Sequence, residues 1–133
     1  MTRWRASYRN LALWTLQGWL AMFFLAAGYA KLTEPMDMLV ILLSWPAQVA
    51  PEMVRALGAA EVLLAVSVLS PLVFRSFGRP LLVLAAMAML ALETAMMVIH
   101  VVYFEWGHVA TNLALILITA IVFLQRTRET SAS

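Results

Sequence analysis

The chain has 133 residues, of which 64% are hydrophobic and only 12% are charged, and its mean hydropathy is +0.89. A water-soluble domain of this length needs far more polar side chains to cover its core, so the composition predicts an integral membrane protein. The absence of cysteine excludes disulfides, thiol redox chemistry and cysteine-ligated metal centres, and the net charge of +2 offers no basic face for nucleic acid.

Several apolar segments are long enough to cross a bilayer, which takes roughly 20 apolar residues of helix. The predicted spans are residues 11–32, 53–74, 80–104 and 109–125. Residues 1–133 are therefore predicted to form a single transmembrane domain with an all-α fold, an integral membrane four-helix bundle.

The first span follows a short basic stretch that contains Arg3, Arg5 and Arg9. A secretory signal begins in this way, but its apolar part has about 7–15 residues, fewer than this segment contains. Lys31 also follows the apolar run directly, so we expect a retained helix rather than a cleaved signal.

Between the first and second spans lies the apolar run "MLVILLSW", residues 38–45. It is too short to cross a membrane, and Pro46 ends it. We expect a short interfacial or re-entrant helix here, within the first outer loop.

The basic residues indicate the orientation of the chain. Only Lys31 and Arg55 lie on the side that carries the first outer loop. The other side holds the remaining ones: Arg3, Arg5, Arg9, Arg75, Arg79, Arg126 and Arg128. The positive-inside rule then places both termini in the cytoplasm.

Polar residues within the spans gather in the outer half of the predicted bundle. All four spans contribute: Lys31, Glu61, Glu93 and His100 (both on the third span), and Asn112. The inner half offers little beyond Gln17, Ser67 and Thr119. Because a charged group in hydrocarbon is costly and usually faces the bundle interior, the pattern predicts a polar, ligand-binding pocket in the outer half.

Glu61 is the centre of this predicted pocket. It can avoid a buried charge by taking up a proton, or it can pair with Lys31 or with protonated His100. Gly28 and Gly58 stand one turn before Lys31 and Glu61 on the same helix faces. They would let a neighbouring helix or a ligand approach closely, so we expect them to line the pocket.

Simpler interpretations remain for each residue. Lys31 could extend to the headgroups, and His100 could mark only the membrane boundary. Asn112, Glu61 and Glu93 could form purely structural hydrogen bonds between helices.

The residues give no pattern for a metal site or for catalysis by this chain alone. Met87 and Met89 point to different helix faces, so the methionines do not suggest copper. A haem between His100 and His108 would need both rings inside the bundle, and we expect His108 to be solvated in the outer loop.

Several stretches together resemble the DoxX-like family of small four-helix bacterial membrane proteins. They are "FFLAAGYAKL" (residues 23–32), "LGAAEVLLAVSVLSP" (residues 57–71), a third helix ending in His100, and "ATNLALIL" (residues 110–117). The likeness covers about residues 13–123. The positions that match the family pattern are Gly28, Lys31, Gly58, Glu61, His100 and Asn112. Glu93 is not part of that pattern, so its predicted role rests only on its being a carboxylate within a span.

The resemblance implies a location in the bacterial cytoplasmic (inner) membrane and a role close to quinone chemistry. Some relatives are linked to the membrane subunit of thiosulfate:quinone oxidoreductase, others to oxidative-stress assemblies, and distant ones to membrane-protein trafficking. We therefore expect the pocket to hold a lipophilic, quinone-like molecule, with the chain acting as an accessory to a partner redox or membrane subunit. The alternatives are an assembly factor, chaperone or structural subunit, and a proton or solute transporter, which the nearly apolar inner half disfavours.

Overall fold

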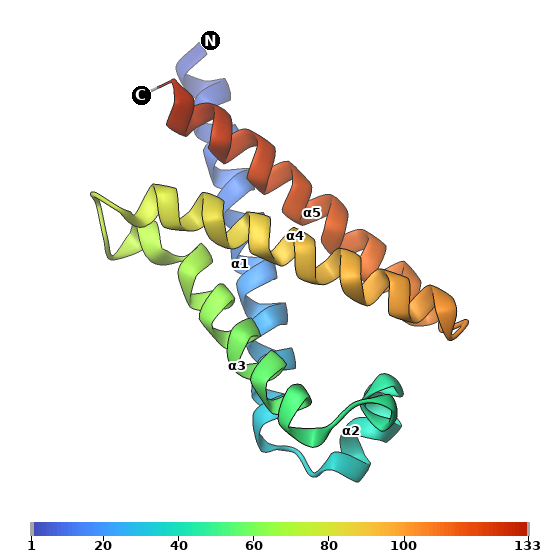
Figure 1. The fold of residues 1–133 in the computed structure, drawn as a ribbon. Helices are drawn as coiled ribbons and strands as arrows, with labels where there is room; N and C mark the ends of the chain where they lie inside the picture. The colour runs from blue at the N-terminus through green and yellow to red at the C-terminus, as the bar shows by residue number, and fades with distance from the viewer. Residues whose placement is uncertain (1, 133) are drawn as a thin grey trace.

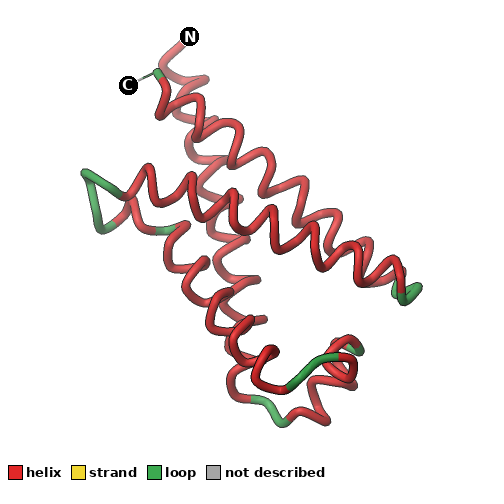
Figure 2. The backbone as a smooth tube through the Cα atoms, viewed as in Figure 1, coloured by secondary structure: helices red, strands yellow, loops and turns green. Residues whose placement is uncertain are grey.

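A computed structural model describes residues 2–132, and nearly all of them lie in helices (Figures 1 and 2). No strand occurs among these residues, so the predicted all-α class is confirmed. The elements are α1 (Thr2–Thr33), α2 (Met36–Leu43), the 3-10 turn η1 (Trp45–Gln48), α3 (Pro51–Val68), the 3-10 turn η2 (Ser70–Leu72), α4 (Gly78–Val102) and α5 (Trp106–Ser131).

The long helices form two pairs that pack against each other. α1 packs along α3, α4 packs along α5, and the two pairs meet mainly where α3 contacts α4 (Figure 1). Both termini lie together at one end of the molecule, which we call the terminal end. The distal end carries α2, η1 and the turn between α4 and α5.

Three helices, α1, α4 and α5, are long and apolar enough to cross a membrane by length and composition. α3 is not in this set; its 18 residues include Glu52, Arg55 and Glu61. Large apolar side chains such as Trp19 and Leu63 are exposed on the helix surfaces, as suits contact with lipid. The structure thus supports a membrane protein and gives three candidate spans where the sequence predicts four.

The helix bounds differ from the predicted spans at several ends. α1 begins at Thr2 and α5 continues to Ser131, because helices extend beyond the apolar residues that define a span in sequence. Helix α3, which corresponds to the second predicted span, ends at Val68 rather than at residue 74. Pro71 explains this, since the residue before a proline disfavours helical geometry and the chain turns through η2 instead.

Two groups of buried apolar residues hold the helices together. The first joins all four long helices in the middle of the molecule: Leu20, Ala21, Phe24, Ala65, Val68, Leu82, Ala85, Met89 and Val122. The second, made by Leu39, Trp45 and Val54, fixes α2 and η1 against α3. α2 and η1 therefore cover the distal end of the helix pairs.

Candidate functional site

A buried ion pair joins α1 and α3 near the distal end. Lys31, in the last turn of α1, donates hydrogen bonds from Nζ to both Glu61 Oε1 and Oε2, each at 2.8 Å. The two residues are only 4% and 7% exposed, and the Lys31 ammonium also lies 5.9 Å from the centre of the Trp45 ring. Lys31 therefore points into the protein and not toward the headgroups.

Gly28 and Gly58 make this pairing geometrically feasible. A Cβ atom at Gly58 would lie 2.7 Å from Lys31 Cβ and 2.9 Å from the Gly28 carbonyl oxygen, and one at Gly28 would lie 2.6 Å from the Gly58 carbonyl oxygen. Side chains at these positions would force α1 and α3 apart. The two glycines lie at the helix contact beside the ion pair and are not among the residues that line the cavity described below.

His100 and His108 face each other across the turn between α4 and α5. His100 Nδ1 lies 2.6 Å from Glu105 Oε2, and the two imidazole rings stack with centroids 5.1 Å apart. His108 lies in the first turn of α5 rather than in the outer loop, and it is half-buried against His100. The cause is a turn of only three residues, 103–105, closed by a hydrogen bond from Glu105 N to the His100 carbonyl oxygen.

Glu93 lies one level deeper, between α4 and α5. Thr119 Oγ1 donates a 2.8 Å hydrogen bond to Glu93 Oε1, and Asn112 Nδ2 donates to the Glu93 main-chain oxygen. Glu93 Oε2 is buried and has no hydrogen-bond partner among residues 2–132. Asn112 and Thr119 thus connect the two helices through one acidic residue.

These side chains surround a cavity of about 110 Å³ at the distal end, which we call the distal cavity. Lys31, Glu61, His100, His108 and Asn112 form part of its wall. The remaining walls are mostly apolar: Phe23, Ala27, Leu43, Trp45, Met96, Thr111 and Leu115.

A second, smaller cavity of about 50 Å³ adjoins the distal cavity and extends to Glu93. It shares five lining residues with the larger one: Phe23, Glu61, Met96, Asn112 and Leu115. All five residues predicted to bind a ligand, Lys31, Glu61, Glu93, His100 and Asn112, therefore lie around two adjoining cavities.

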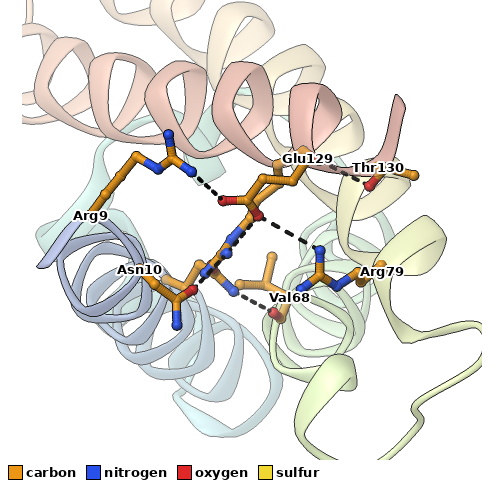
Figure 3. Close-up of polar contacts among 8 residues, drawn as sticks. Arg9, Asn10, Val68, Arg79, Glu129 and Thr130 are labelled. Carbon is orange, nitrogen blue, oxygen red and sulfur yellow. Dashed lines mark hydrogen bonds and ion pairs between the residues drawn. The ribbon is translucent and has the colours of Figure 1, made fainter. Parts of the chain in front are cut away.

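The terminal end contains a polar cluster that was not predicted from the sequence (Figure 3). Arg126 is only 5% exposed, and its Nε donates to Gln17 Oε1 at 2.8 Å. Its Nη1 donates to Asn10 Oδ1 at 3.0 Å and to Glu129 Oε2 at 2.8 Å. The prediction that this half of the bundle holds few polar groups is wrong, because Arg126 extends inward from the end of α5.

The chemistry of the distal cavity is that of hydrogen bonds and ion pairs. The residues from Thr2 to Ala132 include no group of three or more histidines, aspartates or glutamates placed to hold a metal ion. The cavity instead presents an ammonium, a carboxylate, two imidazoles and an amide within apolar walls. Such a site suits a lipophilic molecule that carries a few polar atoms.

Comparison with known families assigns this chain to one of them. A family model described as the DoxX-like family matches residues 15–122. The chain belongs to the DoxX-like family. The matched region includes every residue of the distal cavity, whereas Asn10, Arg126 and Glu129 of this DoxX-like protein lie outside it. Searches of curated proteins and of solved structures find no match.

Proposed function

We propose that this DoxX-like protein binds a small lipophilic molecule with polar ring oxygens, such as a quinone, in the distal cavity. On this proposal it serves as an accessory subunit to a redox enzyme in the bacterial cytoplasmic membrane. The observation that supports the proposal is the convergence of Lys31, Glu61 and His100 on one space whose other walls are largely apolar. A quinone has the same division between polar oxygens and an apolar ring and tail.

The size of the space suits a single ring. The two adjoining cavities measure about 110 Å³ and about 50 Å³. An apolar protein cavity of about 150 Å³ is known to hold a benzene molecule. An isoprenoid tail would extend away from the ring between the helices and into lipid.

Two hydrogen-bonding groups remain available to the ring oxygens. An ammonium has three hydrogens, and the bonds to Glu61 account for two of those of Lys31. His100 binds Glu105 through Nδ1, and its Nε2 has no hydrogen-bond partner among the described residues. Because Nδ1 faces the Glu105 carboxylate, His100 can donate from Nε2 only as an imidazolium paired with Glu105. We propose that Lys31 and His100 in this form donate to the two carbonyl oxygens, and that Glu61 exchanges a proton with the reduced ligand.

A titration with ubiquinone and menaquinone analogues tests this proposal. The decisive variant combines Lys31→Met with Glu61→Leu, because replacing both partners of a buried ion pair by apolar residues often leaves a protein folded. We expect its affinity for the analogues to fall at least tenfold, roughly the loss of one charged hydrogen bond. Glu52→Gln, an exposed change on the same helix, is the matched control and should bind like wild type.

Retention of full affinity by the double variant, with unfolding temperatures in detergent close to wild type, would overturn the proposal. A second measurement identifies the ligand without assuming it. Mass spectrometry of the protein extracted in mild detergent should find a quinone with wild type and not with the double variant.

A structural or assembly role is the second candidate, because the polar groups also satisfy one another. Lys31 pairs with Glu61, and both Asn112 and Thr119 bond to Glu93. If no lipophilic molecule is found with wild type while Glu61→Gln weakens folding, this role is favoured. A proton path is disfavoured, because the apolar core around Leu20 and Met89 separates the polar groups of the two ends.

A further inference from the structure

The terminal end contains a cavity of about 230 Å³ that is independent of the distal cavity. Its wall carries three arginines, Arg75, Arg79 and Arg126, and one carboxylate, Glu129. Trp14, Pro71, Phe74, Leu82 and Thr130 complete the lining. We propose that this cavity binds the phosphate of an anionic phospholipid, and we call it the basic cavity.

The charges around the basic cavity are unbalanced. Arg126 Nη1 lies 2.8 Å from Glu129 Oε2. Arg9 Nη2 and Arg79 Nη1 each lie 3.9 Å from an oxygen of the same carboxylate. Figure 3 draws the contacts of Arg9 and Arg79 with Glu129. The Glu129 carboxylate is thus the shared ion-pair partner of three arginines, Arg9, Arg79 and Arg126. Arg75 has no ion-pair partner among residues 2–132. The surplus positive charge favours an anion.

Arg126 supplies an independent sign of a missing partner. It is nine-tenths or more buried, and its Nε and Nη1 atoms are bonded to protein, but Nη2 is buried with no hydrogen-bond partner. A buried guanidinium donor without an acceptor is costly. Arg126 also lines the basic cavity, so its guanidinium adds positive charge beside a phosphate bound there, although the buried Nη2 atom itself is shielded from the open space.

The guanidinium is already oriented for this role. Gln17 and Asn10 bind two of its nitrogens, and the Trp14 ring lies 5.4 Å from its Cζ atom. Arg75 and Arg79 are exposed and line the same cavity, and planar guanidinium groups such as theirs match phosphate oxygens in pairs. Fixing Arg126 before the ligand arrives lowers the entropy lost on binding.

The surroundings of the basic cavity favour a lipid over a free anion. The turn from α3 to α4 exposes large apolar side chains directly beside Arg75 and Arg79: Leu72, Val73, Phe74 and Phe77. Phe74 and Phe77 stack with ring centroids 4.5 Å apart, and Phe74 also lines the cavity. These exposed apolar side chains next to arginines suit a phospholipid, in which the phosphate adjoins the acyl chains.

The test compares lipid retention by the purified full-length protein, measured by native mass spectrometry. Arg75 and Arg79 lie at the exposed rim, so Arg75→Gln combined with Arg79→Gln should leave the fold intact. We expect wild type to retain phosphatidylglycerol in preference to phosphatidylcholine. The double variant should lose about 10- to 30-fold in apparent affinity for phosphatidylglycerol, at roughly a factor of five per arginine.

The matched control is Arg3→Gln combined with Arg5→Gln, which removes two exposed positive charges at the same end without touching the cavity wall. Its affinity should stay within twofold of wild type. Equal losses in both double variants would overturn the proposal in favour of diffuse surface attraction. A thermal shift with inorganic phosphate but none with phosphatidylglycerol would overturn the lipid assignment in favour of a soluble anion.

Discussion

Lys31 Nζ donates hydrogen bonds to both carboxylate oxygens of Glu61, and the two residues come from helices that contact each other through Gly28 and Gly58. A buried ion pair of this kind is costly to break from one side, since the remaining charge is left without a partner. The pair therefore serves both the packing of α1 on α3 and the chemistry of the distal cavity.

Removal of one partner should destabilise the protein strongly. Lys31→Met alone, or Glu61→Leu alone, is expected to lower the free energy of unfolding by about 3–5 kcal/mol. The double replacement should recover most of that loss. Unfolding in mixed detergent micelles measures the free energy of unfolding of the two single variants and the double variant. Additive losses in the double variant would contradict the pairing.

The contact between α1 and α3 should tolerate no side chain at Gly58. Gly58→Ala puts a methyl group 2.7 Å from Lys31 Cβ and 2.9 Å from a backbone oxygen, so the helices must separate, at a cost of about 1–3 kcal/mol. Gly18→Ala is the control on α1, because nothing lies within 4 Å of the added methyl. It should be neutral or stabilise the helix by up to about 1 kcal/mol. Similar unfolding temperatures for the two variants would disprove the close contact.

The hydroxyl of Thr119 should matter because it donates to a buried carboxyl group. Thr119→Val leaves Glu93 Oε1 without its donor and should cost about 1–3 kcal/mol of stability. Thr94→Val removes a hydroxyl that bonds only within its own helix, on an exposed face, and should change stability by less than about 0.5 kcal/mol. The unfolding midpoints of Thr119→Val and Thr94→Val, measured in the same denaturant series, give the two changes in stability.

The orientation can be measured directly, because the chain has no cysteine of its own. Gln48→Cys lies at the exposed distal end, and Ala132→Cys lies at the terminal end. With both termini in the cytoplasm, as the sequence predicts, a membrane-impermeant thiol reagent should label Gln48→Cys in intact cells. Ala132→Cys should react only after the cells are opened, and the reverse pattern would invert the topology.

The meeting of Lys31 and Glu61 could be predicted because it follows from helix periodicity. A glycine one turn before each residue, near the ends of two long apolar segments, indicates that the two faces pack together. Asn112 could also be placed, since a lone amide within an apolar helix needs an interhelical partner. These positions depend on spacing within a helix, which sequence records well.

Glu105 and His108 could not be assigned, because their positions depend on how tightly the chain turns after α4. A loop one or two residues longer would move His108 away from His100. The signal that was available is the small number of residues between Val102 and Trp106, which forces the two helix ends together.

Arg126 illustrates a different difficulty. A basic residue just past an apolar span is typical of a solvated flank, and nothing in its immediate neighbours shows that it faces inward. The useful signal lies far away in the chain, where Asn10 and Gln17 stand seven residues apart on one face of α1. Only the packing of α1 beside α5 reveals that these groups belong together.

The shortness of α3 has a consequence for the host membrane. At about 1.5 Å per residue its 18 residues measure roughly 27 Å, less than the roughly 30 Å of hydrocarbon in an average bilayer. If α3 crosses the membrane, as the sequence predicts, lipid around this helix must thin to meet its ends, and that distortion costs free energy for each ångström of mismatch. Bilayers with short acyl chains should therefore hold the protein in its folded form better than bilayers with long ones.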